Sequence, residues 1–304
     1  MAVNTVNKQT LYLGIDGGGS KCKAVITDAD HNVLGSAISG PANPLHGYEQ
    51  TINSITESAK LALVDAGLPA TKLSELVAGI GLAGVNLPSL MTKIEQWQHP
   101  FEQMFLTTDL SIACLGAHNG DDGAIMITGT GSCGYSYVKQ QEFFIGGHGF
   151  PHGDKGSGAW TGLQVVTKVL RSLDGLEVDS LMNQQLLNML TCNDCMEVIE
   201  VVAHKPASFF AKLACVAFDN AKKDDELALS IVQDGANYIS DIASRLWQNG
   251  PLSMSLIGGL TPVITPYLNS EIAQRLSPPQ HPPEIGAIIY AKQQLSLAAQ
   301  EQVG

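Results

Sequence analysis

The feature that most constrains the fold is a strand and turn pattern that occurs twice along the chain. Near the start, the apolar run Leu11–Ile15 leads into a glycine-rich turn, and two further segments with strand patterning extend to Ser39. A second such series begins at Gly123, passes through a turn rich in glycine and hydroxyl residues over 128–132, and ends near Ile145. A repeated supersecondary unit of this kind predicts two related domains, each built on a β-meander.

Helices are predicted where apolar residues recur at helical spacing, as in Glu49–Ala66, which ends at the typical stop residue Gly67. The region Gly146–Gly162 is rich in glycine and is expected to be a loop. The other expected strands are 76–82, 101–106 and 254–257, and the other expected helices are 90–99, 111–117, 161–173, 180–190, 208–219, 224–249 and 285–299. The pattern predicts an α/β protein with an N-terminal domain of residues 1–118 plus 286–304 and a C-terminal domain of residues 119–285.

Composition narrows the possible partners. The 304 residues are enough for two domains, and the formal net charge of −12 repels nucleic-acid phosphate and anionic lipid. We therefore expect neither nucleic acid nor membrane as a partner. The polar segment Met1–Thr10 does not resemble a secretory signal, no run approaches a bilayer span, and six scattered cysteines do not suggest a disulfide scaffold, so a cytoplasmic location is expected.

The first glycine-rich turn has the composition of an anion-binding loop. Consecutive glycines let the backbone approach a ligand closely, and successive N–H groups in such a turn form an anion-binding concavity. Asp16 ends the preceding strand and suits Mg²⁺, which we expect it to hold through water. An ordinary hairpin turn is the alternative interpretation. The candidate phosphate ligands in this turn are Gly17, Gly18, Gly19, Ser20 and Lys21.

The second turn, in the corresponding place of the second repeat, has similar chemistry without the acid. Two such turns facing each other across an interdomain cleft would bind the β- and γ-phosphates of ATP, and it is the pair that favours this interpretation over two hairpins. Its candidate phosphate ligands are Thr128, Gly129, Thr130, Gly131 and Ser132. Gly258 and Gly259 follow a later strand and could pack against a purine base, although a tight turn is equally consistent with them.

Asp109 follows a predicted strand and has two interpretations. A carboxylate there could accept the proton of a substrate hydroxyl during phosphoryl transfer. It could equally cap the helix predicted to start near Ser111, since aspartate favours that position. Local sequence does not separate the two.

The glycine-rich loop contains Asp154, which could bind sugar hydroxyls or water around the metal, or could be an ordinary turn residue. His148 and His152 lack an evident third ligand for zinc. The spacing of Cys192 and Cys195 is that of a metal or redox pair, but there is no second pair, so it is interpreted as adventitious.

Taken together, the three glycine motifs Asp16–Ser20, Thr128–Ser132 and Gly258–Leu260 resemble the phosphate-1, phosphate-2 and adenosine motifs of actin/hexokinase/Hsp70-like ATPases. More narrowly, the chain resembles the BadF/BadG/BcrA/BcrD ATPase family and its N-acetylglucosamine and glucosamine kinases. The segments Met126–Ser132 and Gly149–Gly158 carry much of this resemblance. It implies a two-domain actin-like, ribonuclease H-like fold, ATP and Mg²⁺ as cofactors, and a homodimer.

The resemblance also implies site roles. Asp109 would be the catalytic base, which favours the first interpretation of that residue. ATP-dependent 6-phosphorylation of an amino sugar is the implied reaction, with two domains closing on the substrates. The residues implied to contact the sugar are Asn43, Gly84, Asp109, Gly129 and Asp154.

Two positions depart from the family pattern, since Lys155 is usually acidic and His148 is often Trp. A free amino sugar carries an ammonium group, which Lys155 disfavours, so N-acetylglucosamine is preferred over glucosamine as the substrate. Two rival functions remain: an iron–sulfur ATPase activator of a radical dehydratase, for which Cys192 and Cys195 are the candidate ligands, and an ATP-driven switch module.

Overall fold

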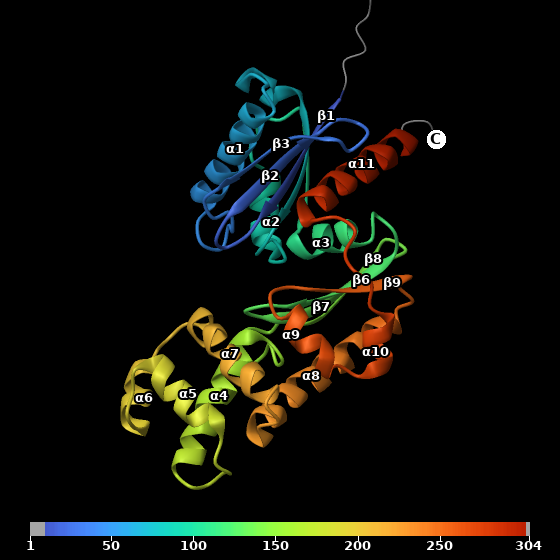
Figure 1. Cartoon of the computed structure of the whole chain (residues 1–304). Helices are drawn as coiled ribbons and strands as arrows, with labels where there is room; N and C mark the ends of the chain where they lie inside the picture. Colours follow the sequence, from blue (N-terminus) through green and yellow to red (C-terminus); the bar gives the residue numbers. More distant parts are fainter. Residues whose placement is uncertain (1–9, 302–304) are drawn as a thin grey trace, which may run out of the picture. The chain divides into compact units, whose positions relative to one another are not determined.

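The structure, a computed structural model, describes residues 10–301 (Figure 1). Residues 1–9 and 302–304, which the sequence assigns to the N-terminal domain, lie outside this part. The chain forms two compact units. Unit 1 contains the described residues up to Gly123 and from Pro279 onward, and unit 2 contains Ala124–Pro278. The divisions expected from the sequence, after residues 118 and 285, lie near these positions.

Unit 1 is built on a five-stranded sheet in the order β3-β2-β1-β4-β5. The first three strands are antiparallel, whereas β1, β4 and β5 run parallel to one another. The strands are β1 Leu11–Gly17, β2 Cys22–Thr27, β3 Val33–Ser39, β4 Leu76–Leu82 and β5 Gln103–Thr108. The helices are α1 Tyr48–Asp65, η1 Ala70–Glu75, α2 Pro88–Glu95, α3 Asp109–Ala117 and α11 Pro283–Glu301.

Side-chain alternation along the strands explains how helices cover both faces of this sheet. Leu13 and Ile15 point to one face, where they join a core that includes Ile55 and Leu63 of α1. Gly14 and Gly79 lie on the opposite face, where the backbone of α11 packs directly against them. Asp16 alternates with Ile15 and therefore points to the face covered by α11. Because of this alternation, the Asp16 carboxylate lies on the face that α11 covers and not in the apolar core on the other face.

Unit 2 combines a smaller sheet with most of the helices. Its four strands have the order β8-β7-β6-β9. They are β6 Gly123–Thr128, β7 Ser132–Val138, β8 Gln141–Gly146 and β9 Ser253–Ile257. The helices are α4 Gly158–Leu173, α5 Leu181–Leu190, α6 Cys195–Val202, α7 Ala207–Ala221, α8 Glu226–Trp247, α9 Thr261–Ile264, η2 Thr265–Tyr267 and α10 Ser270–Arg275.

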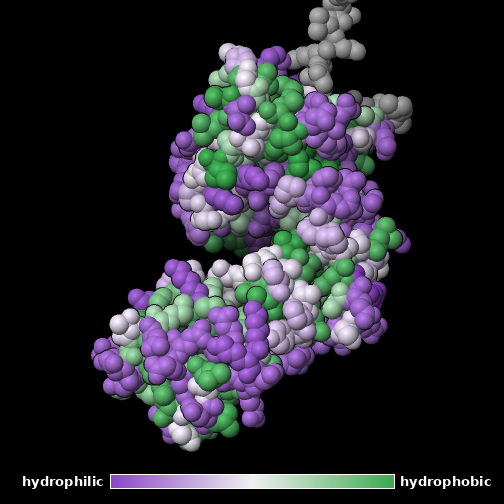
Figure 2. All heavy atoms as spheres, in the orientation of Figure 1, coloured by the Kyte–Doolittle hydropathy of each residue, from purple (hydrophilic) through white to green (hydrophobic). Residues whose placement is uncertain are grey.

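Several elements differ from the sequence expectations. The loop expected over Gly146–Gly162 ends earlier, because Ser157 caps α4 by accepting a hydrogen bond from the Trp160 N–H. The short helices α6, α9 and α10 were not expected, since so few residues show little periodicity. Figure 2 shows hydrophilic residues over much of the visible surface of both units, in keeping with the acidic composition.

Candidate functional site

In unit 1, the candidate residues gather where the parallel strands end. The register of the sheet aligns Asp16 of β1 with Gly81 of β4, and Gly81 with Thr107 of β5. The residues that follow these strands therefore emerge at one edge, the place where open α/β sheets bind ligands. Asp16, the turn after it and Asp109 share this edge.

Backbone hydrogen bonds join three loops at this edge. The Ala42 N–H donates to the Gly18 carbonyl at 2.8 Å, and the Ala83 N–H donates to the Gly17 carbonyl at 2.9 Å. Gly19, Ser20 and Lys21 at the tip of the first turn are exposed, whereas Gly17 is buried and has a structural role. The accessible phosphate ligands predicted here are thus the residues at the tip.

Two of the predicted sugar residues of unit 1, Asn43 and Gly84, lie directly against each other. Gly84 has a positive φ of 88°, and a Cβ at this position would overlap the Asn43 side-chain oxygen. That oxygen also accepts a hydrogen bond from the Leu45 N–H at 2.9 Å. Asn43 is therefore held in one orientation, with Gly84 leaving room for it.

The structure bears on one of the two interpretations of Asp109, that of a helix cap. The residue that caps α3 is Thr108, whose hydroxyl oxygen accepts a hydrogen bond from the Ser111 N–H at 3.1 Å. Asp109 is the first residue of the helix, and its Oδ1 accepts from the Leu110 N–H at 3.0 Å. Because Thr108 supplies the cap, α3 does not require a carboxylate at position 109.

Two other carboxylates, those of Glu284 and Asp109, influence Asp16 in this part of unit 1. Burial, together with the charges of Glu284 and Asp109, raises the pKa of Asp16 to about 6, although Lys21 and Lys23 oppose the shift. Burial also raises the pKa of Asp109 above its usual range. Glu284 itself is buried and forms an ion pair with Lys23. A cation beside Asp16 would relieve this repulsion, so the donor chemistry fits Mg²⁺.

Glu284 is a residue to which sequence reasoning assigned no role at the site. It begins the returning helix α11 and lies far from Asp16 in the sequence. The segment Glu284–Ala287 fits the family resemblance, but local sequence gives Glu284 no role at the site, because only the packing of α11 on β1 brings it beside the first turn.

In unit 2, the second turn is only partly available to a ligand. Thr128 is fully buried, and its hydroxyl pairs with that of Thr261 at 3.4 Å. The Ser132 hydroxyl donates its single proton to the Lys155 carbonyl at 2.8 Å, so it has no proton left for a phosphate oxygen. Both hydroxyls thus have partners within unit 2, and the phosphate contacts of Thr128 and Ser132 stay predictions. Gly129, Thr130 and Gly131 remain accessible.

Asp154 lies directly against this turn. Its Oδ1 accepts from the Gly149 N–H at 3.1 Å, and a Cβ on Gly131 would lie 2.7 Å from its Oδ2. Its neighbour Lys155 forms an ion pair with Asp234 of α8 at 2.7 Å. The structure thus brings Asp154 together with the phosphate turn and gives the Lys155 ammonium a carboxylate partner.

The third glycine motif also meets the second turn. Gly258 has a φ of 125°, and a Cβ there would overlap the Thr128 backbone. The Leu260 N–H donates to the Thr128 carbonyl at 3.0 Å, whereas Gly259 has open space at its Cβ position. Gly258 is therefore required by packing, and Gly259 is the one of the pair whose surface is free to receive a base.

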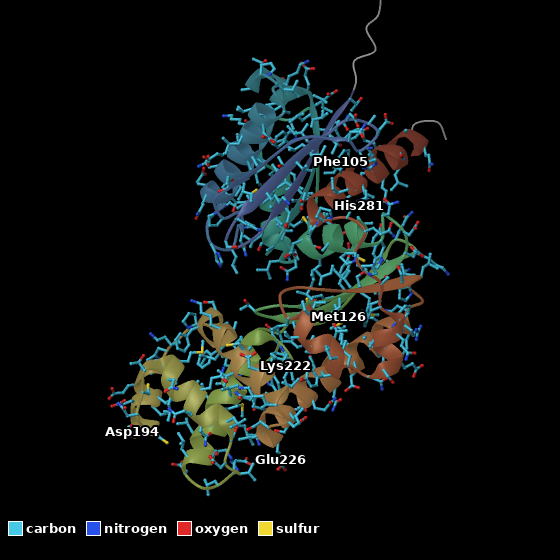
Figure 3. All side chains as sticks on the ribbon, viewed as in Figure 1. Phe105, Met126, Asp194, Lys222, Glu226 and His281 are labelled. Atoms are coloured by element: carbon cyan, nitrogen blue, oxygen red, sulfur yellow. The ribbon has the colours of Figure 1, made fainter. Side chains whose placement is uncertain are left out.

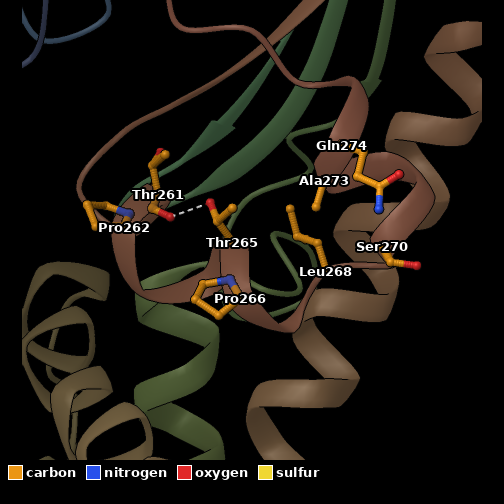
Figure 4. Close-up of a pocket in the computed structure, with 8 residues that line it drawn as sticks. All are labelled: Thr261, Pro262, Thr265, Pro266, Leu268, Ser270, Ala273 and Gln274. Carbon is orange, nitrogen blue, oxygen red and sulfur yellow. Dashed lines mark hydrogen bonds between the residues drawn. The ribbon is translucent and has the colours of Figure 1, made fainter.

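The residues that directly follow this motif in the chain line a pocket of about 630 Å³ (Figure 4). It lies among α9, η2 and α10, where the Thr265 hydroxyl donates to the Thr261 carbonyl at 2.6 Å. Its lining residues are Thr261, Pro262, Thr265, Pro266, Leu268, Ser270, Ala273 and Gln274.

The cysteine and histidine candidates have no third metal ligand beside them in the part of the chain that the structure describes. Asp194 lies between Cys192 and Cys195. Figure 3 shows it far from Met126 of β6, the strand that leads into the second glycine turn of unit 2. Cys192 packs into the core of that unit and Cys195 begins α6. Within residues 10–301, no group of three or more His, Cys, Asp or Glu side chains is placed to hold a metal ion.

The chain belongs to the BadF/BadG/BcrA/BcrD ATPase family, whose model matches residues 13–291. It is 31% identical over 283 residues to the glucosamine kinase GspK of Vibrio cholerae, covering 92% of this chain and 95% of that one. It is 26% identical over 255 residues to an N-acetyl-D-glucosamine kinase of Dictyostelium discoideum, covering 78% and 79% respectively.

Solved structures give the same assignment of fold. A Chromobacterium violaceum protein provisionally named N-acetylglucosamine kinase has a TM-score of 0.84 at 28% identity, with 93% of this chain and 99% of that one covered. The ROK hexokinase of Thermus thermophilus has a TM-score of 0.53 at 17% identity, over 94% and 99% of the chains, and shows the fold alone. These matches confirm the expected family and the α/β, actin-like ATPase fold. In the described part of the chain, no helix is long and apolar enough to cross a bilayer.

Proposed function

We propose that this sugar kinase transfers the γ-phosphoryl group of ATP to the 6-hydroxyl of an amino sugar. The observation that carries the proposal is Asp109: a partly buried carboxylate that directly follows β5 and whose capping role is performed by Thr108. Raised proton affinity is the property that a general base requires. The names of the relatives support an amino sugar as the acceptor.

In the proposed reaction, Asp109 accepts the proton of the sugar hydroxyl as that oxygen attacks the γ-phosphorus. Asn43 and Asp154 bind other sugar hydroxyls, and Gly84 and Gly129 contact the sugar through their backbones. The exposed tip Gly19–Lys21 and the residues Gly129–Gly131 bind phosphate oxygens. Positioning and charge stabilisation supply most of the rate enhancement.

Mg²⁺ would be held by Asp16 through water and would neutralise charge on the phosphates. Glu284 and Lys23 set the electrostatic environment of Asp16 from the same unit. Gly259 would receive the adenine ring, because a Cβ there meets no neighbouring atom.

The identity of the sugar depends on the acetyl group. Glucosamine was disfavoured because of the positive charge of Lys155, but the ion pair of Lys155 with Asp234 offsets that charge. This exposed ion pair weakens the argument against glucosamine. N-acetylglucosamine stays the preferred acceptor in the proposal, with glucosamine as the alternative.

The test is coupled ADP release with Mg·ATP and a panel of N-acetylglucosamine, glucosamine, glucose and N-acetylmannosamine. We expect turnover that depends on one of the two glucosamine sugars, with the 6-phosphate as product by NMR. ATP turnover that is independent of every sugar would overturn the proposal. It would favour the dehydratase activator or the switch module, and bound iron would indicate the activator.

A further inference from the structure

Four hydrogen bonds within unit 2 join the loop that carries Asp154 to the second glycine turn. One runs from the Gly147 N–H at the start of the loop to the Ser132 carbonyl at 3.2 Å, and the other three involve Asp154's side of the loop. The Gly158 N–H donates to the Gly129 carbonyl at 2.8 Å, and the Ala159 N–H donates to the Thr130 carbonyl at 3.2 Å. The last is the bond from the Ser132 hydroxyl to the Lys155 carbonyl. Of the four, only this one is made by a side chain, so it is the one that a substitution can remove.

Asp154 has a backbone conformation that needs support. Its φ is 59°, in the left-handed region that residues other than glycine adopt at a cost. The peptide that follows it carries the Lys155 carbonyl, and the buried Ser132 hydroxyl holds that carbonyl. Without this bond, the carbonyl would lose its partner and the loop would lose one constraint on the Asp154 conformation.

We infer that Ser132 is a positioning residue: its hydroxyl fixes the peptide after Asp154 and thereby sets the affinity for the sugar, without itself contacting phosphate. This inference rests on the proposed function, in which Asp154 binds a sugar hydroxyl. It also gives the second turn two tasks, since Gly129–Gly131 faces the ligand while Ser132 supports the neighbouring loop.

An ion pair also connects the same loop to α8, and it is a weaker constraint than the Ser132 hydrogen bond. Lys155 pairs with Asp234, but both side chains are more than a third exposed, at 38% and 56%. Exposed ion pairs contribute little. We therefore expect Asp234→Asn to change the sugar KM by no more than about twofold. The substitutions at Asp234 and Ser132 each remove one contact to the same loop, so their effects on the sugar KM can be compared.

The kinetic test is Ser132→Ala. The sugar KM should rise by about tenfold, the range expected when a buried carbonyl loses its partner, while the dissociation constant of Mg·ATP without sugar stays within about twofold. Ser132→Thr restores the donor and should recover most of the sugar affinity. Ser172→Ala is the matched control, because the buried Ser172 hydroxyl also donates to a backbone carbonyl, that of Val178, at 2.7 Å.

Hydrogen exchange supplies a readout that does not depend on the substrate. Amides of residues 149–158 should exchange faster in Ser132→Ala than in the wild type, and should be unchanged in Ser172→Ala. If Ser132→Ala does not fold, Ser132→Cys, which keeps the size of the side chain but weakens the donor, is measured in the same way.

The outcomes distinguish the inference from the function on which it rests. Unchanged exchange in the loop, or a loss of Mg·ATP affinity with an unchanged sugar KM, would overturn the positioning role. Faster loop exchange in a protein that turns over no sugar would support the positioning role while sinking the proposed kinase activity.

Discussion

Thr108 and Asp109 divide two tasks at the start of α3. The threonine hydroxyl accepts a hydrogen bond from the helix terminus, and the adjacent carboxylate is partly buried at the edge of the sheet. Aspartate at this point in a sequence usually suggests the first task. The side chain that performs it is the preceding residue, and this detail is what makes Asp109 a candidate base.

Asp109→Asn should leave Mg·ATP binding intact and lower kcat by about 10²–10⁴-fold, the usual contribution of a general base. Asparagine has nearly the same shape but cannot accept the proton. Steady-state kinetics and calorimetric titration of Mg·ATP measure the two effects. Full activity in the variant would remove Asp109 from the mechanism.

The raised pKa of Asp109 predicts where activity falls on acidification. The base must be ionised, so kcat/KM should decline at a pH above the pKa of an ordinary exposed aspartate, about 3.9. Asp16 has a pKa of about 6 in the protein without metal, so its protonation should cause a second decrease in kcat/KM as the pH falls. A higher Mg²⁺ concentration should move the decrease caused by Asp16 to lower pH, whereas the decrease caused by Asp109 should stay at the same pH. A profile that is flat down to about pH 4 would contradict both assignments.

The burial of Asp16 also predicts a stability effect. Its pKa is about 6 in the folded protein and 3.8 for the unperturbed side chain, so the folded state binds the proton more tightly. The cost of ionising it is absent below about pH 4 and fully present above about pH 6, where it reaches about 3 kcal/mol.

Asp16→Asn should therefore raise the free energy of unfolding at about pH 8 without Mg²⁺, by up to about 3 kcal/mol, and the gain should vanish near about pH 4. Urea unfolding at both pH values measures the difference. A variant that is less stable than the wild type at the higher pH would show that the carboxylate is not a stability cost.

At the scale of elements, α11 packs on the sheet through glycines as well as through the side chains of Ile285, Ile288 and Ile289, which form a core with Val25 of β2. Gly14 of β1 and Gly79 of β4 meet the backbone of α11, and Gly286 of α11 meets the Ile112 carbonyl of α3. This close approach places Glu284 beside the first turn. A helix with bulkier contacts would stand farther from the strands and would leave Asp16 without that neighbour.

Gly286→Ala tests this packing. Alanine favours a helix over glycine by about 1 kcal/mol, yet its Cβ would overlap the Ile112 carbonyl. The overlap should prevail and destabilise the protein by about 1–3 kcal/mol. Ser296→Ala on the exposed part of the same helix should change the unfolding free energy by less than about 0.5 kcal/mol. Stabilisation by Gly286→Ala would mean that the helix stands farther away.

At the scale of the whole molecule, the net charge of −12 opposes the approach of Mg·ATP, which is itself an anion. Raising the ionic strength from about 20 to about 150 mM screens this repulsion and should lower the KM for Mg·ATP. The KM of neutral N-acetylglucosamine should not change, whereas that of cationic glucosamine should rise. An increase in the KM for Mg·ATP would instead show that local cations such as Lys21 dominate.

Much of the architecture was predictable because it follows from short-range patterns. The strands Val33–Ser39 and Leu76–Leu82 were predicted with the bounds that the structure has, since their ends coincide with turn residues. The glycine turns were located for the same reason. The start of α4 was missed, because Ser157 lies inside a glycine-rich run that resembles a loop until its capping bond is seen.

The sequence by itself determined the repeat, the α/β class, the family and the list of candidate residues, because all of these depend on residue type and local spacing. Only the tertiary structure decided which of those side chains are accessible. Thr128 is buried, the Ser132 proton is held by Lys155, and Glu284 arrives beside Asp16 from the far end of the chain. Burial and hydrogen-bond partners depend on residues distant in sequence, so no local pattern could reveal them.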